Sequence, residues 1–259
     1  MKRVALVTGS ASGLGVQTVL ALARQGRQLM INYRSSREEA YQLREQVRAL
    51  GVKCEVVQGD VSRMEDCRKI VCETVRQFGR VDMLINNAGP YIFERKKLVG
   101  YTDEEWRLMI DGNLSSVFYL CREVIPLMRR NKWGRIITFG FNQAGQAAAW
   151  MYRGAFASAK VGLVSLTKTL AREESSSGIT VNMVCPGDII GDNKQKRISE
   201  VRESGEQEHT APVGRPGTGE DVARVVQFLC AEDSDFITGS VIEVSGGLNV
   251  LEKRKGSSL

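Results

Sequence analysis

The stretch that most constrains the fold of this chain lies within its first fifteen residues. Val4–Val7 is apolar at every position, Gly9–Gly15 is rich in glycine, and a helical pattern of apolar residues begins at Val16. A short run of this kind suits a strand buried on both faces of a parallel sheet. The glycines let the backbone turn sharply over a helix N-terminus, where unpaired N–H groups favour a pyrophosphate. The spacing Gly-x3-Gly-x-Gly differs from the commonest dinucleotide motif, so an ordinary glycine-rich turn is the alternative.

Strand and helix patterns then alternate along the rest of the chain. Further strands are expected at 29–33, 54–57, 81–85, 134–139, 179–184 and 240–244, and helices between them at 36–51, 62–79, 102–127, 152–174 and 221–230. Ser36, Ser62 and Thr102 each precede a Glu by three residues, the spacing of a capping box. This rhythm predicts a single-domain α/β fold, a Rossmann-type doubly wound parallel sheet of about seven strands with helices on both faces.

Net charge, cysteine spacing and the lengths of apolar runs limit the class of protein but identify no partner. The 259 residues carry a net charge of +6, but the basic residues are dispersed until Lys253-Arg254-Lys255. We therefore expect one domain over 1–250, with a polar, mobile substrate-side segment at 188–212, and a solvated basic tail at 251–259. The six cysteines show no Cys-x-x-Cys spacing, which favours reduced structural thiols. No leader or membrane-spanning run is recognisable, so we expect a cytoplasmic protein with no metal site and no nucleic-acid or membrane partner.

The polar and glycine clusters of the sequence fall where a ligand is expected. In an open α/β sheet a ligand binds beyond the carboxyl ends of the strands, where the strand order reverses. The loops that would converge there are Gly9–Gly15, 34–36, 60–61, 86–89, 140–145 and 186–190.

These clusters resemble those of the short-chain dehydrogenase/reductase family over residues 4–247. The matching marks are Thr8-Gly9-x3-Gly13-x-Gly15, Asp60-Val61, Asn86-Asn87-Ala88-Gly89, Asn113, Lys160, Pro186-Gly187 and Ile237-Thr238-Gly239 with Gly246-Gly247. Within the family, stretches 134–138 and 165–173 are most similar to the 3-oxoacyl-[acyl-carrier-protein] reductases. The resemblance implies an oxidoreductase with a nicotinamide cofactor. It also implies a homotetramer or homodimer assembled through the long helices and the C-terminal strand.

The end of the second expected strand bears on the choice of cofactor. NAD sites usually place an acid there to bind the ribose 2′-hydroxyl. Here Arg34 and Ser35 follow the strand, and they suit a 2′-phosphate instead, so we expect NADP(H) rather than NAD(H). Arg34 could also be an ordinary solvated loop residue. The cofactor-binding residues implied together by the motifs and the resemblance are Gly9, Ser12, Gly13, Leu14, Gly15, Arg34, Ser35, Asp60, Val61, Asn87, Ala88, Gly89, Lys160, Pro186, Gly187 and Ile189.

The resemblance to the family does not extend to the residue that donates a proton. The family pairs a Tyr with a Lys four residues later, but Phe156 stands four residues before Lys160. The Ser of the family falls on Gln143 or Phe141. Asn113 and Lys160 are kept, and Tyr152 is the first candidate for a relocated donor, with a packing role as its alternative. Tyr91 and Asp188 are weaker candidates.

Three functions remain open at this point. The first is an NADPH-dependent reductase that acts on a carbonyl or a conjugated double bond, with a small-molecule or acyl-thioester substrate. The second is a catalytically impaired protein that binds NADP(H) as a sensor or partner. The third is docking of an acidic carrier protein on Arg129, Arg130 and Arg172, whose alternative is a solvated surface.

Overall fold

The computed structural model describes residues 2–207, 211–249 and 251, and these residues form one seven-stranded parallel sheet. The strand order is β3-β2-β1-β4-β5-β6-β7, so the order reverses between β1 and β4. The strands are β1 Val4–Val7, β2 Gln28–Tyr33, β3 Cys54–Gln58, β4 Met83–Asn86, β5 Gly134–Phe139, β6 Ile179–Pro186 and β7 Val241–Val244. The predicted doubly wound sheet is confirmed.

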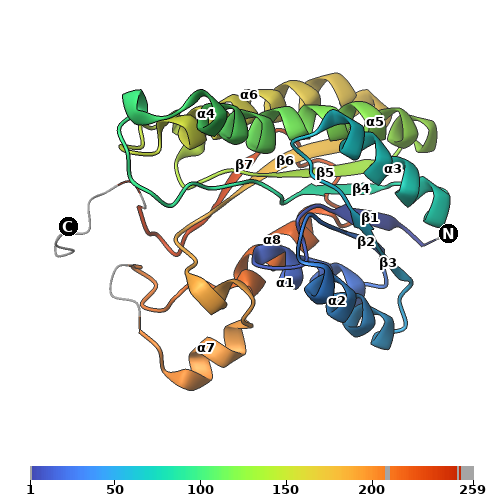
Figure 1. Ribbon diagram of the computed structural model, residues 1–259. Helices are drawn as coiled ribbons and strands as arrows, with labels where there is room; N and C mark the ends of the chain where they lie inside the picture. Colours follow the sequence, from blue (N-terminus) through green and yellow to red (C-terminus); the bar gives the residue numbers. More distant parts are fainter. Residues whose placement is uncertain (1, 208–210, 250, 252–259) are drawn as a thin grey trace.

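Helices cover both faces of the sheet, and each face buries its own apolar cluster (Figure 1). One cluster holds Leu22 and Val226, from the helices of the first face, and the other holds Ile70 and Val124, from those of the second. The first face carries α1 Leu14–Arg24, α2 Arg37–Ala49 and α8 Gly219–Leu229. The second carries α3 Met64–Phe78, α4 Asp103–Ile110, α5 Ser116–Asn131 and α6 Gly154–Glu174.

Only one of the three expected capping boxes forms. The Thr102 hydroxyl accepts from Glu105 N, and the Glu105 carboxylate accepts from Thr102 N, so α4 starts as predicted. Ser36 makes no cap hydrogen bond with its side chain. The Ser62 hydroxyl donates to Asp60 Oδ1 at 2.7 Å, and α3 therefore begins later, at Met64.

The long helix expected over 102–127 is interrupted at the position of Asn113. A π-helical turn, η2 Asp111–Ser115, joins α4 to α5. Within it Gly112 packs so tightly on Pro90 that a Cβ at Gly112 would overlap the proline ring. Single π turns inside helices are frequent at functional sites. The periodicity of the apolar residues does not reveal this turn.

The described part of the segment 188–212, which we expect to be mobile, contains regular structure. It holds η5 Gly191–Lys194 and the short helix α7 Ile198–Ser204, which buries Ile198 and Val201. In Figure 1 this helix lies below the α1 and α8 layer. The expected basic tail lies outside the described residues, apart from position 251. Among the helices that the structure describes, none has the length and apolar character needed to cross a bilayer.

Candidate active site

The loop between β1 and α1 depends on glycine for its close contacts. Gly9 has a φ of +56°, and a Cβ there would lie 2.9 Å from Ala88 Cα. A Cβ on Gly15 would lie 2.6 Å from Ser10 Cα. By contrast, the space above Gly13 is open, with Lys194 Cδ 4.0 Å from the position of a Cβ. Since α1 has no side-chain cap and no acid in its first turn, its N-terminal N–H groups are available to an anion.

Two asparagines hold this loop in place. The Asn87 amide donates to the carbonyls of Thr8 and Gly9 at 2.9 and 3.0 Å. Asn32 Oδ1 accepts from Gly9 N at 3.1 Å, while its amide donates to the carbonyl of Gly59 at 3.1 Å. We did not predict the role of Asn32 from the sequence. A buried polar residue inside an apolar strand was the available signal, because such a group needs hydrogen-bond partners.

Arg34 and Asp60 lie in the loops after the neighbouring strands β2 and β3 and meet at the edge of the site. Their side chains lie 3.8 Å apart, and that of Arg34 is 64% exposed. Asp60 Oδ1 also accepts from the backbone N–H of Ser62, which fixes the carboxylate. Ser35 is exposed beside Arg34, and Val61 is buried. The sequence-predicted residues of this edge are therefore brought together, with the guanidinium still reachable from solvent.

Asn113 and Lys160 form a buried polar pair beside Gly89. The two side chains belong to residues that are 1% and 5% exposed. Asn113 donates to the carbonyls of Pro90 and Met109 at 3.0 Å each, but its Oδ1 has no hydrogen-bond partner within the described chain. A Cβ on Gly89 would overlap this oxygen and lie 3.5 Å from Lys160 Nζ. Both polar atoms therefore point at the same small space.

Burial makes the ammonium of Lys160 unusually acidic. Removal from water lowers the pKa of Lys160 to about 8, and the nearby Cys185 opposes this change only weakly. Burial also raises the pKa of the Cys185 thiol to about 12, so this group is neutral at physiological pH. The described residues offer Lys160 no hydrogen-bond acceptor, and an amine in such a position is suited to bind a hydroxyl-bearing ligand or to transfer a proton.

Aromatic side chains surround the position four residues before Lys160. The Phe156 ring lies 5.6 Å from Lys160 Nζ. Its centroid is 5.0 Å from that of Tyr91, 6.0 Å from that of Trp150 and 6.3 Å from that of Phe141. We did not predict this cluster, because its rings come from three separate segments of the chain.

Tyr152 lies outside α6, in the segment just before the helix. The residue has a φ of +66°, and the helix begins two residues later, not at Tyr152 as expected. The Arg95 guanidinium carbon lies 5.1 Å from the ring centroid of Tyr152, and the Tyr101 hydroxyl donates to its carbonyl at 3.4 Å. The contacts of Tyr152 are thus with the segment before α4.

The region aligned with the serine of the family is tied to β7. The Asn142 amide donates to Glu243 at 2.7 Å, and the backbone N–H of Gln143 donates to the same carboxylate at 2.9 Å. Pro186 closes β6, and Gly187 packs so closely on Ser245 that a Cβ would lie 2.7 Å from Ser245 Cα. Ile189 is buried just beyond them.

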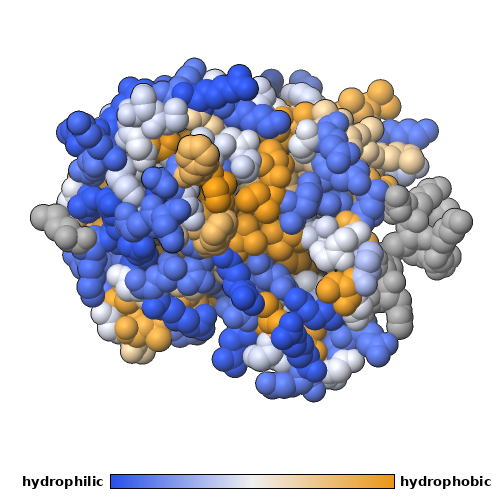
Figure 2. All heavy atoms as spheres, turned by 180° about the vertical axis from the view of Figure 1, so that it is seen from behind, coloured by the Kyte–Doolittle hydropathy of each residue, from blue (hydrophilic) through white to orange (hydrophobic). Residues whose placement is uncertain are grey.

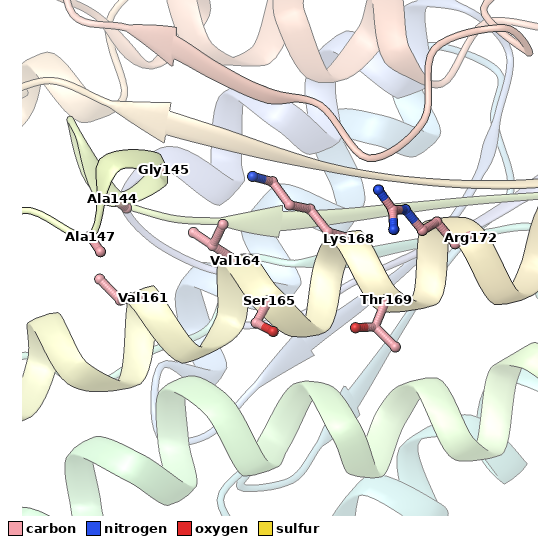
Figure 3. Close-up of a pocket in the computed structure, with 9 residues that line it drawn as sticks. All are labelled: Ala144, Gly145, Ala147, Val161, Val164, Ser165, Lys168, Thr169 and Arg172. Atoms are coloured by element: carbon pink, nitrogen blue, oxygen red, sulfur yellow. The ribbon is translucent and has the colours of Figure 1, made fainter.

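A groove of about 360 Å³ lies farther along α6, and Lys160 is not part of its lining. Figure 3 shows Val161 and Val164 at one end, and Lys168 and Arg172 at the other. The proposed carrier contact Arg129 instead pairs with Glu174 at 2.6 Å, which links α5 to α6.

Comparison with known proteins identifies the family of this chain. The family model described as "Enoyl-(Acyl carrier protein) reductase" matches residues 9–249. "Putative oxidoreductase YtkK" of Bacillus subtilis is 52% identical over 98% of this chain and 99% of its own length. The "3-oxoacyl-[acyl-carrier-protein] reductase FabG" of Staphylococcus epidermidis is 35% identical over 96% of this chain and 99% of its own.

Solved structures agree with this assignment. The structure titled "putative 3-oxoacyl-reductase from bacillus thuringiensis" superposes with a TM-score of 0.90 at 48% identity, covering 97% of this chain and all of that one. The acetoin dehydrogenase YohF of Salmonella typhimurium gives a TM-score of 0.87 at 27% identity, with both chains fully covered. The chain therefore belongs to the short-chain dehydrogenase/reductase family of oxidoreductases.

Proposed function

We propose that this protein is an NADP(H)-dependent reductase of a carbonyl substrate, of the 3-oxoacyl type. The observation that carries the proposal is the buried pair of Lys160 and Asn113 beside Gly89, in which Asn113 Oδ1 has no hydrogen-bond partner among the described residues. Leaving a buried acceptor such as this oxygen unpaired costs about 1–3 kcal/mol, so a site that keeps it is shaped for a ligand.

The residues at the carboxyl edge of the sheet fit a dinucleotide cofactor. Gly9 and Gly15 leave the backbone bare, and the uncapped start of α1 offers N–H groups to a pyrophosphate. Such a cofactor, when bound, supplies hydride chemistry to the site. The full set proposed to hold it is Gly9, Ser12, Gly13, Leu14, Gly15, Arg34, Ser35, Asp60, Val61, Asn87, Ala88, Gly89, Lys160, Pro186, Gly187 and Ile189.

The charge at the end of β2 favours NADP(H) over NAD(H). The strand ends at Tyr33, and the exposed Arg34 follows it, so a 2′-phosphate would meet a cation there. Asp60 keeps Arg34 near the edge of the site, although its carboxylate also competes with the phosphate for the guanidinium.

Each chemical residue has a proposed task in the reduction. Lys160 holds hydroxyl groups of the cofactor and polarises the site, while Asn113 positions the water that returns protons to it. Tyr152 is the first candidate for the proton donor from the sequence alone, and in the structure it contacts Arg95 and Tyr101. A positioned general acid contributes roughly 10²–10⁴ in rate, so the identity of this donor decides whether turnover is fast.

A second function is favoured by one specific observation. Phe156 fills the place beside Lys160 with a ring that carries no exchangeable proton. A protein with no replacement for that proton would bind NADP(H) and turn over slowly, as a sensor or partner.

We further propose that the protein is cytoplasmic and assembles as a homotetramer or homodimer. The terminal strand β7 lies at the open edge of the sheet, with Val241, Ile242 and Val244 only partly buried. Seen from behind, the molecule presents a patch of apolar side chains near its centre (Figure 2). A second copy of the chain would cover such an edge.

The experiment compares NADPH binding with NADPH oxidation. Fluorescence titration with NADPH and with NADH measures binding, and an acetoacetyl thioester and a panel of ketones measure turnover. Tight NADPH binding with turnover supports the reductase, whereas tight binding without turnover on any carbonyl supports the sensor or partner role.

A further inference from the structure

Tyr91 belongs to the same assembly as Lys160 and Asn113. Its ring packs on Phe156 in an edge-to-face arrangement, with the centroids 5.0 Å apart and the planes at 87°. Phe156 in turn lies over Lys160. On its other side, Tyr91 directly follows Pro90, whose carbonyl accepts from Asn113 at 3.0 Å. The phenol of Tyr91 is thus held next to the ring of Phe156, four residues before Lys160.

A fixed positive charge accompanies this phenol. The Arg153 guanidinium carbon lies 5.0 Å from the ring centroid of Tyr91. Arg153 is itself immobilised, because it donates to the backbone carbonyls of Ile92, Phe93 and Glu94. Because the Arg153 side chain is already held in place, it loses little further conformational freedom when a neighbouring oxygen becomes charged.

The surroundings of Tyr91 keep its phenol protonated at neutral pH. Burial raises the pKa of Tyr91, and Arg153 opposes the rise through its charge and a hydrogen bond. Asp188, from the loop after β6, and Tyr101 add to the rise. The phenol is therefore a proton carrier at neutral pH, with a cation in place to stabilise the phenolate that proton loss would leave.

We propose that Tyr91 is the proton donor of the carbonyl reduction, an inference that rests on the proposed reductase function. A bound NADPH would supply the hydride for the new C–H bond at the carbonyl carbon, and the C=O π pair would move to the oxygen. The O–H bond of Tyr91 breaks, and its proton goes to that oxygen to give the alcohol. The phenolate remains paired with Arg153 and regains a proton from water, so NADPH is oxidised and the carbonyl is reduced.

The test removes one hydroxyl at a time and follows both turnover and phenol ionisation. Tyr91→Phe is expected to lower kcat by about 10²–10⁴ while NADPH binding stays as in the natural protein. Tyr41→Phe, on the opposite face of the sheet, loses the same atom and serves as the matched control. In the double variant Tyr91→Phe/Phe156→Tyr, the new phenol four residues before Lys160 is expected to restore turnover.

A second readout needs no cofactor or substrate. Ultraviolet titration of the tyrosines in the free protein should lose one transition in Tyr91→Phe. In Arg153→Gln that transition should move to higher pH, because the cation that favours the phenolate is gone. An unmoved transition would contradict the proposed role of Arg153.

The outcomes separate the two levels of inference. Turnover that is unchanged in Tyr91→Phe but lost in Tyr152→Phe overturns the assignment of Tyr91 and leaves the reductase standing. A natural protein that binds NADPH but reduces no carbonyl overturns both.

Discussion

Replacing Lys160 by Met is expected to make the free protein more stable near neutral pH. Burial lowers the pKa of this ammonium from 10.5 to about 8. At about 1.4 kcal/mol for each pKa unit, the folded state therefore bears a cost on the order of 3 kcal/mol for holding the charge. A thioether of similar length fills the same space without that cost.

The dependence on pH identifies the cause. Below pH 8 the lysine is charged in both the folded and the unfolded protein, so the full cost is present. Between pH 8 and about 10.5 the folded protein releases the proton first, and the natural protein gains stability as pH rises. Since the Cys185 thiol has a pKa of about 12, it stays neutral over this range. The advantage of Lys160→Met should therefore shrink steadily and nearly vanish by about pH 10.5.

Urea unfolding at pH 7, 8.5 and 10 measures this difference. Lys168→Met is the control, because Lys168 is an exposed lysine on the same helix, and it should show no such gain. Saturating NADP⁺ should reverse the order of stability, since the natural protein alone retains the ammonium that binds the cofactor. A Lys160→Met variant that is less stable at pH 7 without cofactor, or whose gain is independent of pH, would refute this account of the buried charge.

Two further substitutions test the proposed cofactor site. Gly89→Ala should abolish turnover and weaken NADPH binding at least tenfold, because the added methyl would overlap Asn113 Oδ1 and occupy the space beside Lys160 Nζ. Activity at the natural level would contradict the placement of the site. Arg34→Ala should weaken NADPH binding by about tenfold or more and leave NADH binding nearly unchanged, as fluorescence titration would measure. Equal losses for both cofactors would argue against a 2′-phosphate at Arg34.

The fold could be predicted from short-range patterns because it is encoded in them. All seven strands were predicted, the first from a continuous apolar run and the other six from short segments that also contain polar residues. The boundaries that failed depended on single hydrogen bonds. Ser62 bonds to Asp60 instead of capping α3, and the Asn113 amide bonds to Pro90 and Met109 at the π turn. The spacing of apolar residues along the chain does not reveal which hydrogen-bond partner a polar side chain takes.

The cofactor loop and the polar pair were likewise predictable, whereas the surroundings of the donor were not. The glycines are local signals, whereas Lys160 and Asn113 follow from the family resemblance, and the structure places Gly89 beside both side chains. Tyr91 comes from the connection after β4, and Phe141 and Trp150 from the connection before α6, so their contacts with Phe156 depend on packing between segments. Sequence spacing pointed to Tyr152, but spacing along a helix has no meaning for a residue that precedes the helix.

The central claim is that this chain reduces a carbonyl with NADPH, and the most direct measurement is NADPH oxidation by the natural protein. Acetoacetyl thioesters and a ketone panel serve as substrates, with Phe156→Tyr assayed beside it. We predict oxidation by the natural protein that depends on the carbonyl substrate. Bound NADPH that no carbonyl oxidises in the natural protein, with turnover appearing only in Phe156→Tyr, would contradict the claim and show that Phe156 silences the site.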